Sequence, residues 1–392
     1  MACSNQGNPP SALILISFDG FRWDYLDHAE TPNFDRLTSH GIRARGLIPV
    51  FPTKTFPNHY SIVTGLYPAN HGVVANVFYD PEYDEHFRAG TREAAQEERW
   101  WGGEPLWVSA ERQGLKTAPK FWPGNEAPVQ GVRPSYSMPY QHGMPNPERV
   151  EQVLEWLDLP VAQRPSFITL YFSMVDSAGH AYGPDSPQVT EKVVEADQLL
   201  GQLWEGLEQR SLLQSVNILI VSDHGMVATS PLRAVALDDY VDLEKANVVH
   251  WAPATGLWPS EENLQEVAAA AAQVPHTRLL SGQELKEHFN YAGHRRIPPL
   301  LLLAEEGWSI ATSQFIKENP ERLQGGSHGY DHRLQSMQGI FLAHGPAFKQ
   351  GYVVEAFENV HIHPLMGHLL GIETPPSDGR LEAVAHLLRQ AP

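Results

Sequence analysis

Residues 12–20, ALILISFDG, join an apolar run of strand length to an aspartate and a glycine. The run from Ala12 to Phe18 predicts a strand that is buried on both faces, as strands of parallel sheets are. Comparable runs occur at residues 167–174, 216–221 and 340–343, and residues 300–303 are a candidate for a fifth strand. Ligands bind beyond the carboxyl ends of such strands, so Asp19 lies where a ligand-binding or catalytic residue is expected.

Helical segments separate these runs. Residues 31–41 begin with Thr-Pro and end with Gly, which is the order favoured at the start and the end of a helix. Further helices are expected at residues 147–156 and 189–207. This alternation predicts an α/β fold, with a doubly wound, mainly parallel central sheet and helices on both faces.

The domain organisation predicted is a disordered tail over residues 1–10 and one domain over residues 11–392. Two stretches of that domain look like additions. Residues 80–150 are rich in Pro, Gly, Trp and Tyr and predict long loops at the mouth of the site. Residues 228–325, with a helix expected over 261–273, predict a smaller inserted region.

The 392-residue chain is acidic, with 28 Lys and Arg against 46 Asp and Glu, and its formal net charge is -18. Its 42% hydrophobic content is sufficient for a large buried core. The acidity disfavours nucleic-acid polymers, whose phosphates are held by clustered Lys and Arg. An anionic small-molecule substrate would therefore need a local positive centre, which bound metal ions can supply.

Cysteine usage restricts both the metal chemistry and the cell compartment. Cys3 is the only cysteine, so any zinc site must use His and Asp. Residues 1–4, MACS, fit a start codon before a mature bacterial lipoprotein N-terminus with a lipid anchor, and equally a free cysteine on a flexible tail. No apolar run reaches the roughly 18 residues that span a bilayer. We expect a periplasmic, cell-envelope or secreted protein whose signal peptide has been removed, although low cysteine usage also fits the cytosol.

Zinc-binding residue types gather in four short segments that lie far apart in the chain. A fifth segment, TKTFPNHY, offers a hydroxyl at Thr55. Three carboxylates, three imidazoles and one hydroxyl suffice for two tetrahedral zinc sites that share a catalytic alkoxide. All-oxygen ligation would instead suit magnesium or calcium. The six candidate His and Asp ligands are Asp19, Asp176, His180, Asp223, His224 and His328.

Two pairs of these ligands need a particular backbone geometry. Asp223 and His224 are adjacent, and neighbours on an extended strand point apart, so the chain must turn there, as Gly225 permits. Asp176 and His180 are four residues apart with a glycine between them. We expect one tight loop to bring both of these side chains to a single ion.

The candidate nucleophile is the hydroxyl of Thr55. It precedes FPNHYSIVTG, which predicts a short helix. The positive end of the helix dipole and the free backbone N–H groups favour an alkoxide and hold a phosphoryl oxygen. Zinc would supply the larger effect, since it lowers the pKa of a bound water from about 15.7 to about 7. Two alternatives stay open: Thr55 as a helix cap only, and Thr53 as the nucleophile.

The surroundings of Thr55 also indicate the kind of substrate. No Lys or Arg occurs between Phe56 and Phe87. A phosphomonoesterase must hold additional charge on the nonbridging oxygens, commonly with an arginine near the nucleophile. The pattern therefore favours a phosphodiester or pyrophosphate substrate, unless a distant basic residue folds into the site.

Together these segments resemble the signatures of the nucleotide pyrophosphatase/phosphodiesterase family, in particular its bacterial members, within the alkaline phosphatase superfamily. The similarity covers most of the chain, and its most specific parts are TKTFPNHYSIVTG and SDHGM. It extends through SFDGFRWDYL, TPNFDRL, GEPLWV, DSAGHAYGPDS, GSHGYD, GPAFK and PPSDGR. The resemblance implies an alkaline-phosphatase-like fold with two zinc ions, one held by Asp176, His180 and His328 and the other by Asp19, Asp223, His224 and Thr55.

The resemblance also implies the residues that bind the substrate. Asn76 would donate a hydrogen bond to a nonbridging phosphoryl oxygen beside Thr55, and Phe56 would form an aromatic wall for the nucleobase. Tyr140 and Tyr171 would complete that slot, although Tyr171 lies in a predicted strand and suits the core equally well. The match is weakest over residues 80–150, which leaves base and leaving-group specificity open.

The activity implied is hydrolysis of nucleotide phosphodiester and pyrophosphate bonds, with a covalent Thr55 intermediate and release of nucleoside 5′-monophosphate. One alternative is a phosphonate or lipid-headgroup phosphodiesterase with the same zinc site, in which Phe56 faces a quaternary ammonium group. Another is a zinc-stabilised binding protein without turnover. A sulfatase is excluded, because it needs a modified Cys or Ser in a C-x-P-x-R setting and the only cysteine is Cys3.

Overall fold

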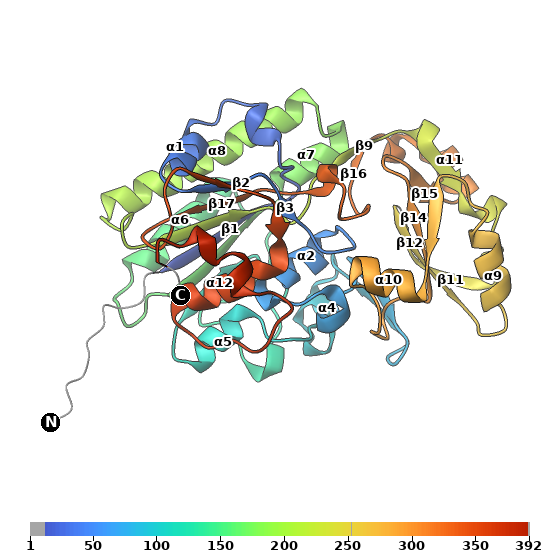
Figure 1. The fold of residues 1–392 in the computed structure, drawn as a ribbon, viewed down its shortest axis with the longest axis horizontal. Coiled ribbons are helices and arrows are strands. Elements are labelled where there is room, and N and C mark those ends of the chain that lie inside the picture. Colours follow the sequence, from blue (N-terminus) through green and yellow to red (C-terminus); the bar gives the residue numbers. More distant parts are fainter. Residues whose placement is uncertain (1–11, 252, 391–392) are drawn as a thin grey trace.

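The computed structural model describes residues 12–251 and 253–390. Its central feature is a seven-stranded sheet in the order β18-β2-β17-β8-β1-β7-β6 (Figure 1). β17 runs antiparallel to both of its neighbours, and the remaining pairs are parallel. The strands are β1 (Leu13–Phe18), β2 (Ile42–Ala44), β6 (Thr117–Lys120), β7 (Phe167–Phe172), β8 (Asn217–Val221), β17 (Phe341–His344) and β18 (Tyr352–Val354). The predicted tail and Cys3 lie outside the described residues.

Both faces of this sheet are buried, because side chains alternate along each strand between two cores. On β1, Leu13 and Leu15 pack into one core, and Ile14 and Ile16 pack into the other. One face carries α2 (Thr55–Thr64), α5 (Leu106–Arg112) and α12 (Ile362–Leu370); the other carries α1 (Pro32–Ser39), α6 (Asn146–Asp158) and α8 (Pro187–Gln209) (Figure 1). The predicted doubly wound, mainly parallel sheet is confirmed.

The ends of several predicted elements differ from expectation. The helix expected over 261–273 is the shorter α9 (Leu264–Ala271), because residues 261–263 and 272–273 form turns. The run at 300–303 forms β14 (Leu300–Ala304), which belongs to a separate antiparallel sheet.

The stretch from 80 to 150 is more regular than predicted. β4 (Val77–Asp80) and β5 (Glu85–Arg88) form a hairpin, which α4 (Arg92–Gln96) and α5 follow. β6 then joins the central sheet as an edge strand parallel to β7. Only residues 121–145 fit the predicted loops, with a single 3-10 turn at Val129–Gly131.

The predicted inserted region forms a lobe beside the central sheet (Figure 1). β9 (Val227–Thr229) pairs with β16 (Gly325–Ser327), so the two ends of the region meet. Between them lies a four-stranded sheet in the order β11-β12-β14-β13, one face of which packs into the main core through Leu301 and Leu303. Besides β14, the strands of this sheet are β11 (Ala246–His250), β12 (Ala254–Pro259) and β13 (Thr277–Leu280). The region also contains α9, β10 (Ala234–Ala236), β15 (Ser309–Ala311), α10 (Gly282–Phe289) and α11 (Ser313–Glu318).

Short elements complete the described chain. α3 (Pro68–His71) follows α2, α7 (Met174–Tyr182) follows β7, and β3 (Leu47–Ile48) pairs with β19 (Phe357–Glu358). No helix among the described residues combines the length and the apolar character needed to cross a membrane.

Candidate metal centre and active site

The candidate ligands converge at the carboxyl ends of neighbouring strands. Asp19 follows β1 directly, and Asp223 is the second residue after β8. Asp176 lies in the first turn of α7, which begins just after β7. β1 pairs with both β7 and β8, so the ends of these three strands lie side by side. The topology of the sheet therefore brings three carboxylates together.

One group of ligand atoms comes from Asp176, His180 and His328, which lie within 4.8 Å of one another. The Asp176 Oδ1 atom is 3.4 Å from Nε2 of His180 and 3.8 Å from Nε2 of His328. The expected tight loop is wrong, because Asp176 and His180 lie on α7. Residues four apart on a helix share one face, and this brings the two side chains together.

A second group is formed by Asp19, Asp223 and His224. Nε2 of His224 is 3.4 Å from Oδ1 of Asp19 and 3.0 Å from Oδ2 of Asp223. The chain leaves β8 before Asp223, and it passes very close to the segment that contains Ser336. A Cβ at Gly225 would lie 2.1 Å from the Ser336 carbonyl oxygen, so the glycine is needed for this close approach.

The three imidazoles are oriented by backbone carbonyls. Nδ1 of His180, His224 and His328 lies 2.8, 2.9 and 2.8 Å from the carbonyl oxygens of Gly326, Gly225 and Thr53, respectively. A carbonyl only accepts, so each Nδ1 carries the proton and each Nε2 presents a lone pair. These lone pairs face carboxylate oxygens, which is unfavourable unless a cation lies between them.

The carboxylates show the same requirement for a cation. Oδ1 of Asp19, Oδ1 of Asp176 and Oδ2 of Asp223 are buried and form no hydrogen bond with any described residue. Burial, together with the negative charges of Asp223 and Asp176, raises the pKa of Asp19 well above its usual value. Burial and the charge of Asp176 raise the pKa of Asp223 to about 8. These buried carboxylates and the three imidazoles therefore fit bound metal ions, and a set of His and Asp ligands suits zinc.

Thr55 and Thr53 have different surroundings. The Thr53 hydroxyl is buried, donates to the carbonyl of Tyr330 at 3.1 Å and accepts from the backbone N–H of Gly329 at 2.8 Å. Thr55 is the first residue of α2. Its hydroxyl lies 3.5 Å from Nε2 of His224 and makes no hydrogen bond to the backbone of the described chain. Of the two hydroxyls, only that of Thr55 adjoins the ligand group and remains available for chemistry.

Asn76 lies beside Thr55 and is anchored to the start of α2. Its Oδ1 accepts a hydrogen bond from the backbone N–H of Phe56 at 2.9 Å. This bond leaves the amide Nδ2 as the end that donates to another group. The predicted role of Asn76 as a donor to a phosphoryl oxygen is compatible with this orientation.

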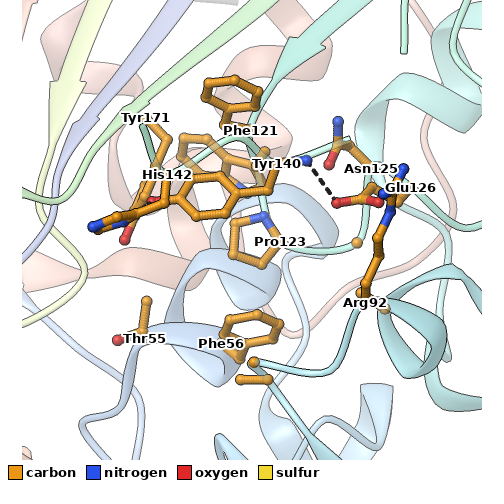
Figure 2. Close-up of a pocket in the computed structure, with 15 residues that line it drawn as sticks. Thr55, Phe56, Arg92, Phe121, Pro123, Asn125, Glu126, Tyr140, His142 and Tyr171 are labelled. Carbon is orange, nitrogen blue, oxygen red and sulfur yellow. Dashed lines mark hydrogen bonds between the residues drawn. The ribbon is translucent and has the colours of Figure 1, made fainter. Parts of the chain in front are cut away.

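A cavity of about 440 Å³ opens beside Thr55, and most of its large side chains are aromatic. Figure 2 shows the ring of Phe56 facing those of Tyr140 and Phe121 across the cavity, with Arg92 and Glu126 at the end away from Thr55. Such a space suits a flat ring system attached to a group at Thr55. The lining residues are Thr55, Phe56, Ala89, Gly90, Arg92, Ala95, Phe121, Trp122, Pro123, Gly124, Asn125, Glu126, Tyr140, His142 and Tyr171.

Both predicted tyrosines line this cavity. Tyr171 is a buried residue of β7, and its hydroxyl donates to Oδ2 of Asp19 at 2.5 Å, so it is part of the core and of the site at once. Tyr140 is 40% exposed, and its ring lies 6.1 Å from that of Tyr171. Glu126 holds the Tyr140 backbone, because its Oε1 accepts from the Tyr140 N–H at 2.9 Å (Figure 2).

The sequence interpretation missed several residues of the site. Residues 121–126 come directly after β6, and the strand-end rule would have indicated them if this short strand had been recognised. His59 is buried, with Nδ1 2.9 Å from the Thr55 carbonyl oxygen and 3.4 Å from Oδ2 of Asp223. The window without Lys or Arg is flanked by Lys54 and Arg88, and both of these line a further cavity beside Asn76.

Comparison with known proteins places this chain in a family. The family model of type I phosphodiesterase / nucleotide pyrophosphatase matches residues 13–331. Venom phosphodiesterase CdcPDE of Crotalus durissus collilineatus is 38% identical over 399 residues, which cover 98% of this chain and 47% of that protein. Ectonucleotide pyrophosphatase/phosphodiesterase family member 3 of Rattus norvegicus is 37% identical over 394 residues, covering 97% and 44%. The chain belongs to the type I phosphodiesterase / nucleotide pyrophosphatase family, and it spans about half the length of these two relatives.

A solved structure agrees over nearly the whole chain. Murine ectonucleotide pyrophosphatase/phosphodiesterase 5, as an inactive variant in complex with AMP, superposes with a TM-score of 0.91 at 33% identity. The match covers 97% of this chain and 100% of that one. The predicted alkaline-phosphatase-like fold is thereby confirmed.

Proposed function

We propose that this chain hydrolyses nucleotide phosphodiester and pyrophosphate bonds and releases nucleoside 5′-monophosphate through a covalent Thr55 intermediate. The observation that carries the proposal is the position of Thr55. Its Oγ1 lies 3.5 Å from Nε2 of His224, and the same residue lines the aromatic cavity. A hydroxyl shared by a metal-ligand group and a cavity for a flat ring suits transfer of a nucleotidyl group. The AMP bound to the murine relative supports this choice of substrate.

Two zinc ions are proposed as cofactors, one held by Asp176, His180 and His328 and the other by Asp19, Asp223, His224 and Thr55. When bound, zinc would lower the pKa of an oxygen that it holds and neutralise negative charge on the phosphoryl group. The unpaired buried carboxylate oxygens and the inward-facing Nε2 atoms support this assignment.

The residues of the chain then divide the reaction into two displacements. Thr55 gives its proton to solvent, and Oγ1 forms a bond to phosphorus as the bond to the leaving oxygen breaks. Nδ2 of Asn76 and the N-terminus of α2 hold a nonbridging oxygen. Water next attacks phosphorus, the Oγ1–P bond breaks, and Thr55 recovers a proton as the nucleoside monophosphate departs. Phe56 and Tyr140 hold the base through both steps.

The test compares a diester with its monoester. Zinc-loaded protein is incubated with the p-nitrophenyl ester of thymidine 5′-monophosphate and with thymidine 5′-monophosphate itself, beside a Thr55→Ala variant. We expect cleavage of the diester alone, loss of that cleavage in the variant, and a nucleotidylated Thr55 peptide after acid quenching. Faster release of phosphate from the monoester would contradict the proposal.

We also infer a bacterial origin and a location in the periplasm, the cell envelope or outside the cell. The likeness of MACS to a lipoprotein N-terminus supports the bacterial origin. The similarity to a venom phosphodiesterase supports a location outside the cytosol. Fractionation of cells that express the full gene, with palmitate labelling to detect a lipid on Cys3, tests the location. Recovery of the protein only from the cytosol would contradict the inferred location.

A further inference from the structure

A second cavity, of about 250 Å³, lies beside the start of α2. Thr55 and Phe56 line the aromatic cavity, whereas the preceding Lys54 lines this one together with Asn76. The opposite part of its lining comes from the inserted region, through His250 at the end of β11 and the adjacent Trp251. The main body and the inserted region therefore build this cavity jointly. We refer to it as the basic cavity.

The charge of the basic cavity is opposite to that of the whole chain. Its ionisable lining residues are Lys54, Arg88 and His250, and none of the described residues that line it is acidic. Nζ of Lys54 donates to the carbonyl of His328 at 2.8 Å, which places its ammonium group next to a proposed zinc ligand. Arg88 is exposed and forms no ion pair with any described residue. In a chain of net charge -18, this arrangement concentrates positive potential beside Asn76.

The imidazole of His250 has unused hydrogen-bonding capacity. Both ring nitrogens are buried and have no hydrogen-bond partner in the described chain. The ring lies over Gly256, its neighbour on β12, where a Cβ would approach the Cε1 atom to 2.8 Å. Burial and the charge of Lys54 lower the pKa of His250 to about 4, so it is neutral at physiological pH and offers one donor and one acceptor. A polar ligand in the basic cavity would satisfy these nitrogens.

The size of the basic cavity limits what it can hold. Pockets for whole organic ligands measure about 300–1,000 Å³. The basic cavity, at about 250 Å³, is smaller and suits a phosphate or diphosphate group better than a second nucleoside.

We propose that the basic cavity binds the anionic leaving group of the substrate, a phosphate or diphosphate, and thereby selects nucleotides with pyrophosphate linkages over diesters with an aryl leaving group. The inference rests on the proposed function, because attack by Thr55 defines which group leaves. When the bond from the nucleotidyl phosphorus to the bridging oxygen breaks, that oxygen keeps the electron pair and the leaving phosphate gains negative charge. Arg88 and Lys54 stabilise this charge, and His250 donates to or accepts from the leaving group.

The test uses two substrates with one nucleoside: thymidine 5′-triphosphate, and the p-nitrophenyl ester of thymidine 5′-monophosphate. For the full zinc-loaded chain, Arg88→Gln is expected to lower the ratio of kcat/KM for the triphosphate to kcat/KM for the ester by at least about tenfold. The inhibition constant of inorganic pyrophosphate against the ester should rise by a similar factor. His250→Ala should shift the ratio in the same direction, and His250→Asn, which keeps a donor and an acceptor, should shift it less.

Arg45→Gln is the matched control, because Arg45 is exposed, pairs with Glu355 at 3.1 Å and lines neither cavity. It should leave the ratio of the two kcat/KM values as it is in the wild-type chain. Zinc content and Tm of each variant establish that the fold is retained. Turnover of both substrates with an unchanged ratio in Arg88→Gln would overturn the leaving-group site alone. Turnover of neither substrate by the wild-type chain would overturn the proposed function, and this inference with it.

Discussion

The two cavities at the start of α2 differ in size, lining and charge. The aromatic cavity measures about 440 Å³ and is lined by the rings of Phe56, Phe121 and Tyr140. The basic cavity measures about 250 Å³ and is lined by the side chains of Lys54, Arg88 and His250. Thr55 and Asn76 lie where they meet. A substrate with one flat end and one charged end would therefore bind in a single orientation, with its phosphorus at Thr55.

The two cavities also differ in the parts of the chain that build them. The aromatic cavity uses the loop after β6 and the segment around Tyr140, all within the main body. The basic cavity needs β5 of the main body and His250 of the inserted region. The main body alone therefore builds the proposed base site, whereas the proposed leaving-group site also requires the inserted region.

The largest effect should come from Thr55, which serves both cavities. Thr55→Ala is expected to reduce kcat/KM for the triphosphate and for the aryl ester alike by at least about 10³-fold, because the nucleophile is removed. Thr55→Ser keeps a hydroxyl and should retain part of the activity. Steady-state kinetics on both substrates measure these losses. An alanine variant that cleaves either substrate at the wild-type rate would show that another group attacks phosphorus.

Metal removal should abolish turnover and make stability depend on pH. Without metal, burial and the charge of Asp176 raise the pKa of Asp223 to about 8, whereas an unfolded aspartate titrates near about 3.9. The protonated carboxyl therefore contributes stability that is fully present below about pH 4 and is lost as the pH rises towards about 8. Bound metal favours the ionised carboxylate and should remove this dependence.

Calorimetry at about pH 5 and about pH 8, with and without a chelator, measures this effect. The chelated protein should have the lower Tm at the higher pH, and restoring zinc should raise that Tm. Equal Tm values for the chelated protein at both pH values would mean that the buried carboxylates do not repel one another as the geometry indicates.

How much the sequence predicts differs between the central sheet and the cavities. The buried strands β1, β7 and β8 can be predicted from their apolar runs. Because β1 and β8 are parallel, Asp19 and Asp223 lie at the same end of the sheet, beyond the carboxyl ends of these strands. The grouping of these ligands follows from topology alone. The pairing of Asp176 with His180 follows from the sequence for the wrong reason, because the intervening glycine predicts a loop but lies within α7.

The cavities could not be predicted in this way. β6 has four residues, one of them a proline, and gives too weak a signal to indicate that the chain after it forms a wall of the site. His250 and Arg88 line the same cavity only because the inserted region packs against the hairpin of β4 and β5. Such contacts depend on packing between segments that are distant in sequence, and local periodicity carries no information about them.

Phe56 tests the aromatic cavity alone. Its ring packs 5.9 Å from that of Phe87 and 6.1 Å from that of Trp101, which fixes it in place. Because stacking on a base contributes about 1–3 kcal/mol, Phe56→Ala should lower kcat/KM roughly tenfold to hundredfold. Both substrates carry the same base, so their ratio should not change, in contrast to Arg88→Gln. Phe56→Tyr, which keeps the ring, is the control. A changed ratio in Phe56→Ala would mean that the two cavities do not act separately.

Tyr140 should have the smallest effect of the residues compared, because the residue is 40% exposed and its nearest aromatic ring is that of Phe121, at 5.2 Å between ring centroids. An exposed ring gains less from stacking than the half-buried Phe56, so Tyr140→Ala should raise KM by about threefold to tenfold for both substrates and leave kcat nearly unchanged. Tyr140→Phe keeps the ring and loses only the hydroxyl, with its interactions with His142 and Arg149, so it should behave nearly as wild type. A loss larger than that of Phe56→Ala would show that the segment carrying Tyr140 closes over the base, and that the aromatic cavity depends more on this segment than on the rigid start of α2.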